Sequence, residues 1–251
     1  SKKGKTILEV ENLVMEDKLH KGKNKVKRIS FDVKEGEIVT IAGIDGNGQS
    51  ETIFGITGLE KIKEGKIIYK DQDITNYSIF KRNNMNLSHI PEDRHKHGLV
   101  LDYTLAENMV LEEYWKEEFS KHGFLKKKEI WAYCDKLIEK YDIRSSNGAS
   151  STARSMSGGN QQKGVVAREI SRNPDLLIAV QPTRGLDVGA IEYIHNRIMD
   201  VRNSGKAVLL VSFELEEVMK LSDRILVMFE GEIVGELDPK TTSLQELGLY
   251  M

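Results

Sequence analysis

The glycine-rich segment from Gly43 to Ser50, GIDGNGQS, has the residue types and spacing of a phosphate-binding loop. In such a loop the backbone N–H groups and the start of the following helix hold phosphates, and a lysine after the last glycine neutralises them. Here Gln49 stands at the position of that lysine. The spacing alone therefore fits two interpretations equally well, a phosphate loop and an ordinary glycine-rich turn into a helix.

A second segment, SMSGGNQQKG (155–164), contains Ser157, Gly158, Gly159, Asn160 and Gln161. The two glycines let a backbone approach a ligand closely, and the serine offers a hydroxyl. A helix that starts near Asn160 would direct its positive end at an anion. These residues resemble the signature of ATP-binding-cassette (ABC) ATPases, and this resemblance favours the phosphate-loop interpretation.

Other motifs occur in the order in which this family has them. The segment LLIAVQPTRGLDVGA falls at the family's second phosphate motif, and RGLD (184–187) falls at the loop that crosses the dimer interface. PEDRHKHGLV (91–100) and YTLAENM (103–109) fall where the family senses its membrane partner. The short segments GGNQQK and PEDR resemble motifs of the second of two cassettes fused in one subunit, as in importers of simple sugars and nucleosides. GIDGNGQSE and QPTRGLD favour the nucleoside branch, and the first cassette would precede Ser1.

The resemblance implies the roles of individual residues. ATP would lie against Gly43, Asp45, Gly46, Asn47, Gly48, Gln49, Ser50 and Glu51. The family uses a lysine of the phosphate loop, an aspartate that holds a magnesium-bound water, a glutamate that polarises the attacking water, a glutamine that binds magnesium and water, and a histidine that contacts the γ-phosphate. In this sequence those places are held, in order, by Gln49, Val180, Gln181, Glu92 and Phe213. We therefore expect the chain's own site to bind ATP weakly, with weak or absent magnesium binding, and to be nearly inactive; Ser50 is the only candidate metal ligand.

The signature belongs to the part of the family pattern that stays intact. In this family two cassettes close head to tail, and each ATP lies between the loop of one and the signature of the other. Ser157, Gly158, Gly159, Asn160 and Gln161 would then complete the ATP site of a partner cassette, with Gly185, Leu186 and Asp187 as the interface loop. The implied partners are that cassette, transmembrane permease subunits and, indirectly, a solute-binding protein, at the cytoplasmic face of the membrane.

Two alternatives come from other functional classes. A self-sufficient ATPase would need Lys163 or Arg184 to replace the missing lysine. A soluble ABC protein acting on nucleic acid would need a basic face, and the basic stretch KLHKGKNKVKR (18–28) is the one local candidate. The formal net charge of −2 and the absence of aromatic residues from that stretch favour a solvated hairpin loop, so no nucleic-acid partner is expected.

Composition and hydrophobic periodicity define the elements that must position these motifs. The 251 residues, 39% of them hydrophobic, are enough for a proper core, and the single cysteine, Cys134, excludes an internal disulfide framework. No apolar run approaches the roughly 20 residues needed to cross a bilayer. TILEVENL and VKRISFDV alternate like antiparallel strands, whereas EIVTIAG, DLLIAVQP and AVLLVSF are almost wholly apolar, as central parallel strands are.

Helical spacing dominates the middle of the sequence. AENMVLEEYWKEEF and KKKEIWAYCDKLIEKYDI predict helices whose Trp and Tyr residues form a local core, and ASSTARSMSG (149–158) predicts an exposed loop. ELEEVMKLSDRILVMFEGEIVGEL predicts a helix followed by a hairpin. The expected fold is therefore α/β: a P-loop NTPase core with a central, mainly parallel sheet, an antiparallel β subdomain and an inserted helical subdomain. We expect a single domain over 1–251, with a core at about 5–90 and 165–240 and the helical subdomain at about 91–164.

Overall fold

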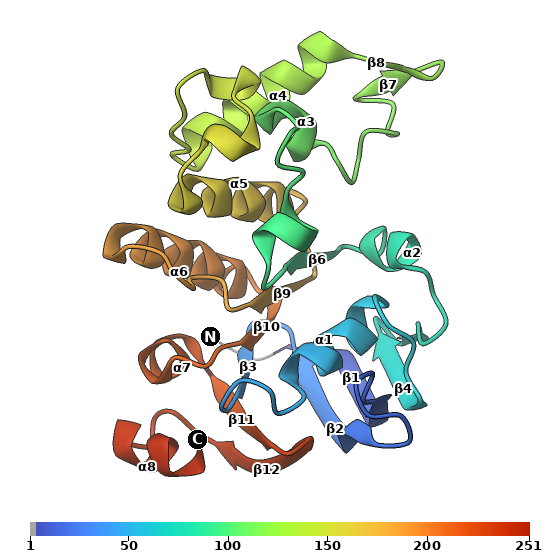
Figure 1. Ribbon diagram of the computed structural model, residues 1–251, viewed down its shortest axis with the longest axis vertical. Coiled ribbons are helices and arrows are strands. Elements are labelled where there is room, and N and C mark those ends of the chain that lie inside the picture. The colour runs from blue at the N-terminus through green and yellow to red at the C-terminus, as the bar shows by residue number, and fades with distance from the viewer. Residues whose placement is uncertain (1–3) are drawn as a thin grey trace. The chain divides into compact units, whose positions relative to one another are not determined.

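The alternating and the apolar runs form strands of two different sheets in the computed structural model, which describes residues 4–251 (Figure 1). The alternating runs lie in an antiparallel sheet of order β2-β1-β4-β5. Its strands are β1 (Thr6–Glu16), β2 (Asn24–Lys34), β4 (Glu64–Tyr69) and β5 (Gln72–Asp73). The expected hairpin loop over 18–28 is shorter than predicted, because β2 already begins at Asn24.

The apolar runs form the second sheet, of order β12-β11-β3-β10-β9-β6. Its strands are β3 (Ile38–Ala42), β6 (Leu87–Ile90), β9 (Leu176–Val180), β10 (Ala207–Val211), β11 (Arg224–Phe229) and β12 (Glu232–Leu237). The strands β9, β10, β3 and β11 run parallel, and β12 pairs with β11 as the expected closing hairpin. Every residue of β3, β9 and β10 is buried, which agrees with the parallel-strand prediction.

The chain divides into two units, which we describe separately. Unit 1 comprises Ser1–His89, Pro174–Gln181 and Ile198–Met251, and unit 2 comprises Ile90–Asn173 and Pro182–Arg197. The helices of unit 1 are α1 (Gln49–Thr57), α2 (Ile79–Asn83), α7 (Leu215–Leu221) and α8 (Leu244–Tyr250). The core of unit 1 joins side chains of both sheets with Ile53 and Ile56 of α1, so the helix that follows the glycine loop is held by core packing.

Unit 2 is helical. It contains α3 (Leu105–Met109), α4 (Lys127–Lys140), α5 (Gly158–Ser171) and a small hairpin of β7 (Ser120–Lys121) and β8 (Phe124–Leu125). Single turns occur at Arg94–Gly98, Gly148–Ser150 and Ala153–Ser155, and α6 (Val188–Asn203) starts in unit 2 and ends in unit 1. Unit 2 includes residues beyond the expected limits of 91–164, and Ala167 and Ile170 of α5 pack in one core with α3 and α4.

Three expectations for the middle segment are wrong in detail. The helix predicted from AENMVLEEYWKEEF is limited to α3, which ends at Met109. Of the Trp and Tyr residues expected in the local core, Tyr141 is buried there and Tyr133 packs against it, but Trp115 and Trp131 are 46% and 43% exposed. Residues 149–158 are not simply an exposed loop, since Ala149, Ser151, Ala153 and Met156 of that stretch are buried.

Candidate functional site

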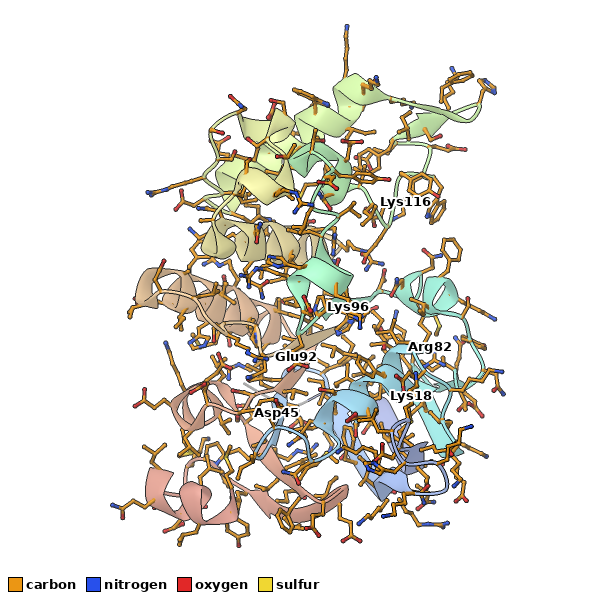
Figure 2. The ribbon with its side chains drawn as sticks, in the orientation of Figure 1. Lys18, Asp45, Arg82, Glu92, Lys96 and Lys116 are labelled. Carbon is orange, nitrogen blue, oxygen red and sulfur yellow. The ribbon has the colours of Figure 1, made fainter. Side chains whose placement is uncertain are left out.

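The glycine loop of unit 1 connects β3 to α1 and has a backbone that only glycine accommodates well. Gly43, Gly46 and Gly48 have φ values of 141°, 91° and 102°, in the left-handed region. A Cβ atom at Gly48 would lie 2.9 Å from the carbonyl oxygen of Lys25. The loop is therefore a formed strand–loop–helix element with Asp45 exposed near its tip (Figure 2).

Gln49, at the lysine position, turns its side chain back onto the loop. Its Nε2 donates to the carbonyl oxygen of Ile44 at 3.0 Å, and its Oε1 accepts from the N–H of Asn47 at 3.0 Å. The residue is only 1% exposed. Gln49 thus ties the two sides of the loop together and does not extend into solvent.

Asn47 fixes the same loop to the β11–β12 turn. Its Oδ1 accepts from the N–H of Glu230 at 2.8 Å, and its carbonyl oxygen accepts from the N–H of Gly231 at 3.0 Å. Its Nδ2 donates to the carbonyl oxygen of Ile44 at 2.8 Å. Asn47 therefore connects the middle of the loop both to the β11–β12 turn and to Ile44 at the beginning of the loop.

Ser50 and Glu51 occupy the first turn of α1 and are partly buried. Burial raises the pKa of the Glu51 carboxyl above its usual value, and nearby Lys25 acts in the opposite direction. When ionised, a carboxylate in this turn is favoured by the helix dipole, as a phosphate would be. The first turn of α1, Gln49, Ser50 and Glu51, therefore offers a hydroxyl but contains no cation.

The end of β9 holds the residues at the second phosphate motif. Val180 is buried, and its side chain offers no polar atom. Gln181 has a positive φ of 46°; its N–H donates to the carbonyl oxygen of Val211 at 2.8 Å and its Oε1 accepts from the N–H of Phe213 at 2.9 Å. Phe213 packs against the core of unit 1. The amide of Gln181 is used to hold the backbone after β10, and an amide is no base near neutral pH.

The segment expected to be the signature lies in unit 2, where a helix begins, as predicted, close to Asn160. Ser157 is the N-cap, and its Oγ accepts from the N–H of Asn160 at 3.3 Å and from Asn160 Nδ2 at 3.0 Å. Ser157 is exposed, and Gly158, Gly159 and Asn160 are partly exposed. The side chain of Asn160 also accepts from the N–H of Arg144 at 2.8 Å. The N-terminal turn of α5 is therefore ordered and accessible within unit 2.

Gln161, the last signature residue, is 5% exposed and joins the signature to the PEDRHKHG segment. Its Nε2 donates to the carbonyl oxygen of Ala153 at 2.9 Å, and its Oε1 lies 3.3 Å from Arg94 Nε and 2.9 Å from His95 Nε2. A Cβ atom at Gly158 would lie 2.7 Å from Arg94 Nη2. The sequence did not predict that Arg94 and His95 contact Gln161, because nothing in the PEDRHKHG segment indicates a contact with residues 66 or 67 positions later.

Glu92 and the interface loop also belong to unit 2. Glu92 Oε1 lies 3.4 Å from Nη1 of Arg184, which is largely exposed (Glu92 is labelled in Figure 2). Gly185 has a φ of 73°, Leu186 follows it in the loop, and Asp187 Oδ1 accepts from the N–H of Ala190 at 2.9 Å near the start of α6. In the part of the chain that the structure describes, no three His, Cys, Asp or Glu side chains gather as a metal site.

The two cations considered as lysine substitutes have partners in unit 2. Lys163 Nζ lies 3.2 Å from the carbonyl oxygen of Asp142, 3.6 Å from its carboxylate and 4.8 Å from the centre of the Tyr193 ring. Arg184 pairs with Glu92. Neither side chain is thus an unengaged cation.

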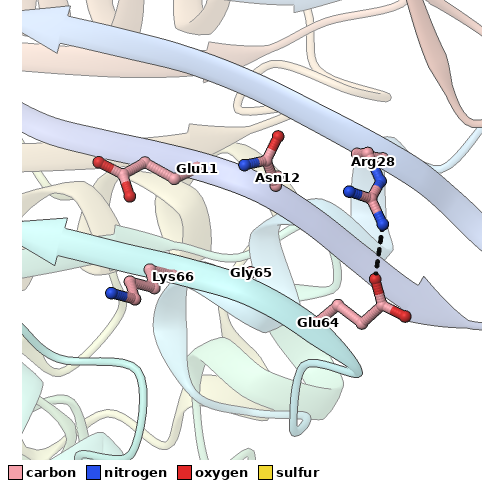
Figure 3. A pocket seen from close by; sticks show the side chains of 6 residues that line it. All are labelled: Glu11, Asn12, Arg28, Glu64, Gly65 and Lys66. Atoms are coloured by element: carbon pink, nitrogen blue, oxygen red, sulfur yellow. Dashed lines mark hydrogen bonds and ion pairs between the residues drawn. The ribbon is translucent and has the colours of Figure 1, made fainter.

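Two surface cavities carry both signs of charge. A cavity of about 370 Å³ in unit 2 is lined by residues that include Ser157, Gly159, Asn160, Lys163, Asp187 and Tyr193. A groove of about 400 Å³ on the antiparallel sheet is lined by Glu11, Asn12, Arg28, Glu64, Gly65 and Lys66 (Figure 3).

The basic stretch at 18–28 contributes to ion pairs in unit 1. Within it, Arg28 pairs with Glu64 at 2.9 Å (Figure 3). Lys18, labelled in Figure 2, pairs with Glu60 at 2.8 Å. Part of the positive charge of this stretch is therefore neutralised by glutamates.

Comparison with known proteins identifies the class that this fold and these motifs define. Residues 26–184 match the family model described as ABC transporter, and the chain belongs to this family. The fold is shared with solved ATP-binding cassettes: one, a dimer in a post-hydrolysis state bound to ADP and Pi, has a TM-score of 0.80 at 22% identity and covers 94% of this chain and 100% of its own. No helix between residues 4 and 251 has the length and apolar character needed to cross a membrane.

Within the family the chain is similar to ATP-binding proteins of importers. It is 51% identical over 245 residues to the nucleoside import ATP-binding protein NupA of Lactococcus lactis subsp. cremoris (strain MG1363), covering 98% of this chain and 48% of that protein. It is 50% identical over 248 residues to the guanosine import ATP-binding protein NupO of Bacillus subtilis (strain 168), covering 99% and 48%. The chain spans about half the length of these curated relatives.

Proposed function

We propose that residues 1–251 form one nucleotide-binding domain, the second cassette of an ABC importer ATPase subunit, which helps to power uptake of a nucleoside or a simple sugar. The names of NupA and NupO support a nucleoside as the solute. The partners of this cassette would be the other cassette, permease subunits at the cytoplasmic face of the membrane and, through them, a solute-binding protein.

The proposal depends most on a contrast between the two units. In unit 1, the positions of the family's lysine, aspartate and glutamate are held by Gln49, Val180 and Gln181, none of which carries a charge. In unit 2, the signature retains its serine and both glycines at an accessible helix start. Because the catalytic groups are missing and the signature is kept, this chain would serve ATP that is held by the partner cassette.

The missing groups determine how much ATP affinity and hydrolysis the chain's own loop loses. A charge-assisted contact to phosphate contributes about 1.5–3 kcal/mol, so its loss weakens binding by roughly one to two decades. Val180 cannot hold a magnesium-bound water, and Phe213 offers no side-chain donor or acceptor to a γ-phosphate. We therefore propose that Asp45–Ser50 retain weak ATP binding with little or no magnesium, and that this site contributes almost no hydrolysis.

Two substitutions in the assembled tandem subunit test the proposal. Gly158→Asp places a carboxylate beside the γ-phosphate held by the other cassette, where like-charge repulsion in a partly desolvated site costs several kcal/mol. ATPase activity and transport should both fall at least about a hundredfold. Gln181→Ala should leave most of the turnover, since the water-polarising group that matters belongs to the partner.

Both variants need the same assembled transporter, with subunit level and assembly measured. A Cβ atom at position 158 would lie 2.7 Å from Arg94 Nη2, so the end of the Arg94 side chain must move to accept the substitution, and the measured subunit level shows whether the Gly158→Asp chain folds. If Gln181→Ala were inactive and Gly158→Asp were tolerated, the chain would be hydrolysing ATP at its own site, and the proposed role in the partner's site would be wrong.

A further inference from the structure

The glycine loop of unit 1 has one of its phosphate-facing backbone groups already occupied. A phosphate loop works by presenting several backbone N–H groups to an anion. In this chain the N–H of Asn47, in the middle of the loop, donates to Oε1 of Gln49 at 3.0 Å. An amide oxygen of the chain itself thus stands where a phosphate oxygen would accept a hydrogen bond.

The rest of the Gln49 side chain is held as firmly. Nε2 donates to the carbonyl oxygen of Ile44, which also accepts from Asn47 Nδ2, and only 1% of the residue is exposed. A Cβ atom at Gly43 would lie 2.8 Å from Gln49 Nε2, so the amide is packed against the first glycine of the loop. Both polar ends of the amide are satisfied, and leaving this position would break two hydrogen bonds.

We infer that Gln49 closes the phosphate loop of this chain, so that a nucleoside di- or triphosphate binds there only after the Gln49 amide has moved away. The absence of lysine removes an attraction, whereas the Gln49 amide adds a competitor. The apparent affinity of such a loop is its intrinsic affinity multiplied by the fraction of chains in which the loop is open. This inference concerns the chain's own loop and holds whether or not the signature acts on a partner's ATP.

Removing the side chain separates competition from lost attraction. Gln49→Ala has no lysine and no amide, so it keeps the charge defect and abolishes the closure. We expect calorimetry in EDTA to show ATP binding about tenfold tighter than in the wild-type chain, the ratio for an open fraction of about one in ten. If the lost charge alone weakens binding, Gln49→Ala will bind no more tightly than the wild type, and that result overturns the inference.

Two control variants make this comparison specific. Thr57→Ala removes a buried hydroxyl that donates to the carbonyl oxygen of Ile53 at 2.9 Å on the same helix, so it perturbs α1 without touching the loop. Its ATP affinity should equal that of the wild type. Gln49→Glu keeps an acceptor for the N–H of Asn47 and adds a negative charge, so it should bind ATP no better than the wild type. Tighter binding by either control would contradict the inference.

Amide hydrogen exchange gives a readout that does not depend on nucleotide. The Asn47 amide should exchange at least about tenfold more slowly in the wild-type chain than in Gln49→Ala. If Gln49→Ala fails to fold, the exchange rate of the Asn47 amide in the wild-type chain is sufficient to test the inference. An Asn47 amide that exchanges at the rate of an unprotected peptide overturns the closure, and a protected one supports it. Failure of the proposed role in trans would leave all these outcomes unchanged.

Discussion

Replacing Arg82 with methionine removes the cation that holds the far end of the phosphate-loop helix. Arg82 lies on α2, is 3% exposed and donates to four carbonyl oxygens within unit 1 (Figure 2). Two of them, Gly55 and Ile56 in the last turns of α1, accept from Nη1 at 2.9 and 2.7 Å. Since α1 has no basic residue of its own in its last turn, Arg82 supplies the positive charge that a helix C-terminus favours.

The cost of the change follows from what it leaves behind. The two hydrogen bonds to Gly55 and Ile56 are the buried ones; each of these carbonyls left without Arg82 costs about 1–3 kcal/mol, and loss of the charge at the helix end adds about 0.3–1 kcal/mol. Methionine keeps most of the aliphatic packing of the arginine stem. We therefore expect Arg82→Met to lower the free energy of unfolding by about 4 kcal/mol.

Thermal unfolding followed by circular dichroism measures this loss. In a chain of this length each 1 kcal/mol shifts Tm by about 2–4 °C, so Arg82→Met should melt roughly 10 °C below the wild type. The matched control is Lys81→Met on the same helix. Lys81 is exposed, and its ammonium lies 3.6 Å from the centre of the Tyr77 ring, a contact of about 1 kcal/mol at most. Equal Tm values for the two variants would refute the assigned role of Arg82.

The remaining predictions concern the loop and the charged interior of unit 2. Gln49→Lys should tighten ATP binding by about two to three decades, about one from removing the Gln49 amide and about one to two from the restored charge, without giving turnover, because Val180 and Gln181 provide neither a magnesium ligand nor a base; substantial hydrolysis by this single variant would mean that the catalytic positions are assigned wrongly. In the wild-type chain, calorimetry should detect weak ATP binding that hardly changes with magnesium; tight, magnesium-dependent binding would contradict this. Burial, together with neighbouring Glu169, raises the pKa of Glu112 from 4.5 to about 8, so the folded state binds the extra proton, and stability present below pH 4.5 should be lost as pH rises towards about 8. Glu112→Gln should flatten that part of the stability–pH curve, and an unchanged slope would show that Glu112 does not titrate there.

The sequence predicted the parts of the fold whose pattern is local. The strands β3, β9 and β10 are buried on both faces, and an unbroken apolar run records that directly. The glycine loop between a strand and a helix, and a helix starting near Asn160, were predicted for the same reason, since both depend on residues close together in the sequence.

Features that depend on distant contacts could not be predicted. Apolar residues continue at helical spacing beyond Met109, but the chain leaves the helix there, and carboxyl oxygens of Glu112 and Glu113 lie 3.3 and 3.4 Å from the guanidinium of Arg172, which follows α5. In α4 the buried residues Ile130, Cys134 and Leu137 recur at helical spacing, and Trp131, which was expected inside with the other Trp and Tyr residues, lies outside that stripe. The hydrogen bond of the Gln49 side chain to the loop backbone and the position of Arg94 beside Gly158 are likewise contacts that local sequence patterns do not reveal.

A single introduced thiol tests most directly whether the signature serves ATP bound by a partner. Burial raises the pKa of the Cys134 thiol to about 12, so the natural cysteine should resist labelling, whereas Ser157→Cys would be exposed. Labelling at residue 157 is measured by peptide mass spectrometry with and without ATP, and Lys240→Cys, also exposed, reports general effects of ATP on labelling.

The comparison is made in the isolated chain at low concentration and in the assembled tandem subunit. The account predicts that ATP slows labelling of Ser157→Cys at least about tenfold in the assembled subunit and has no effect on the isolated chain. Equal protection in the isolated chain, or none in the assembled subunit, would contradict the claim that this signature completes the ATP site of another cassette.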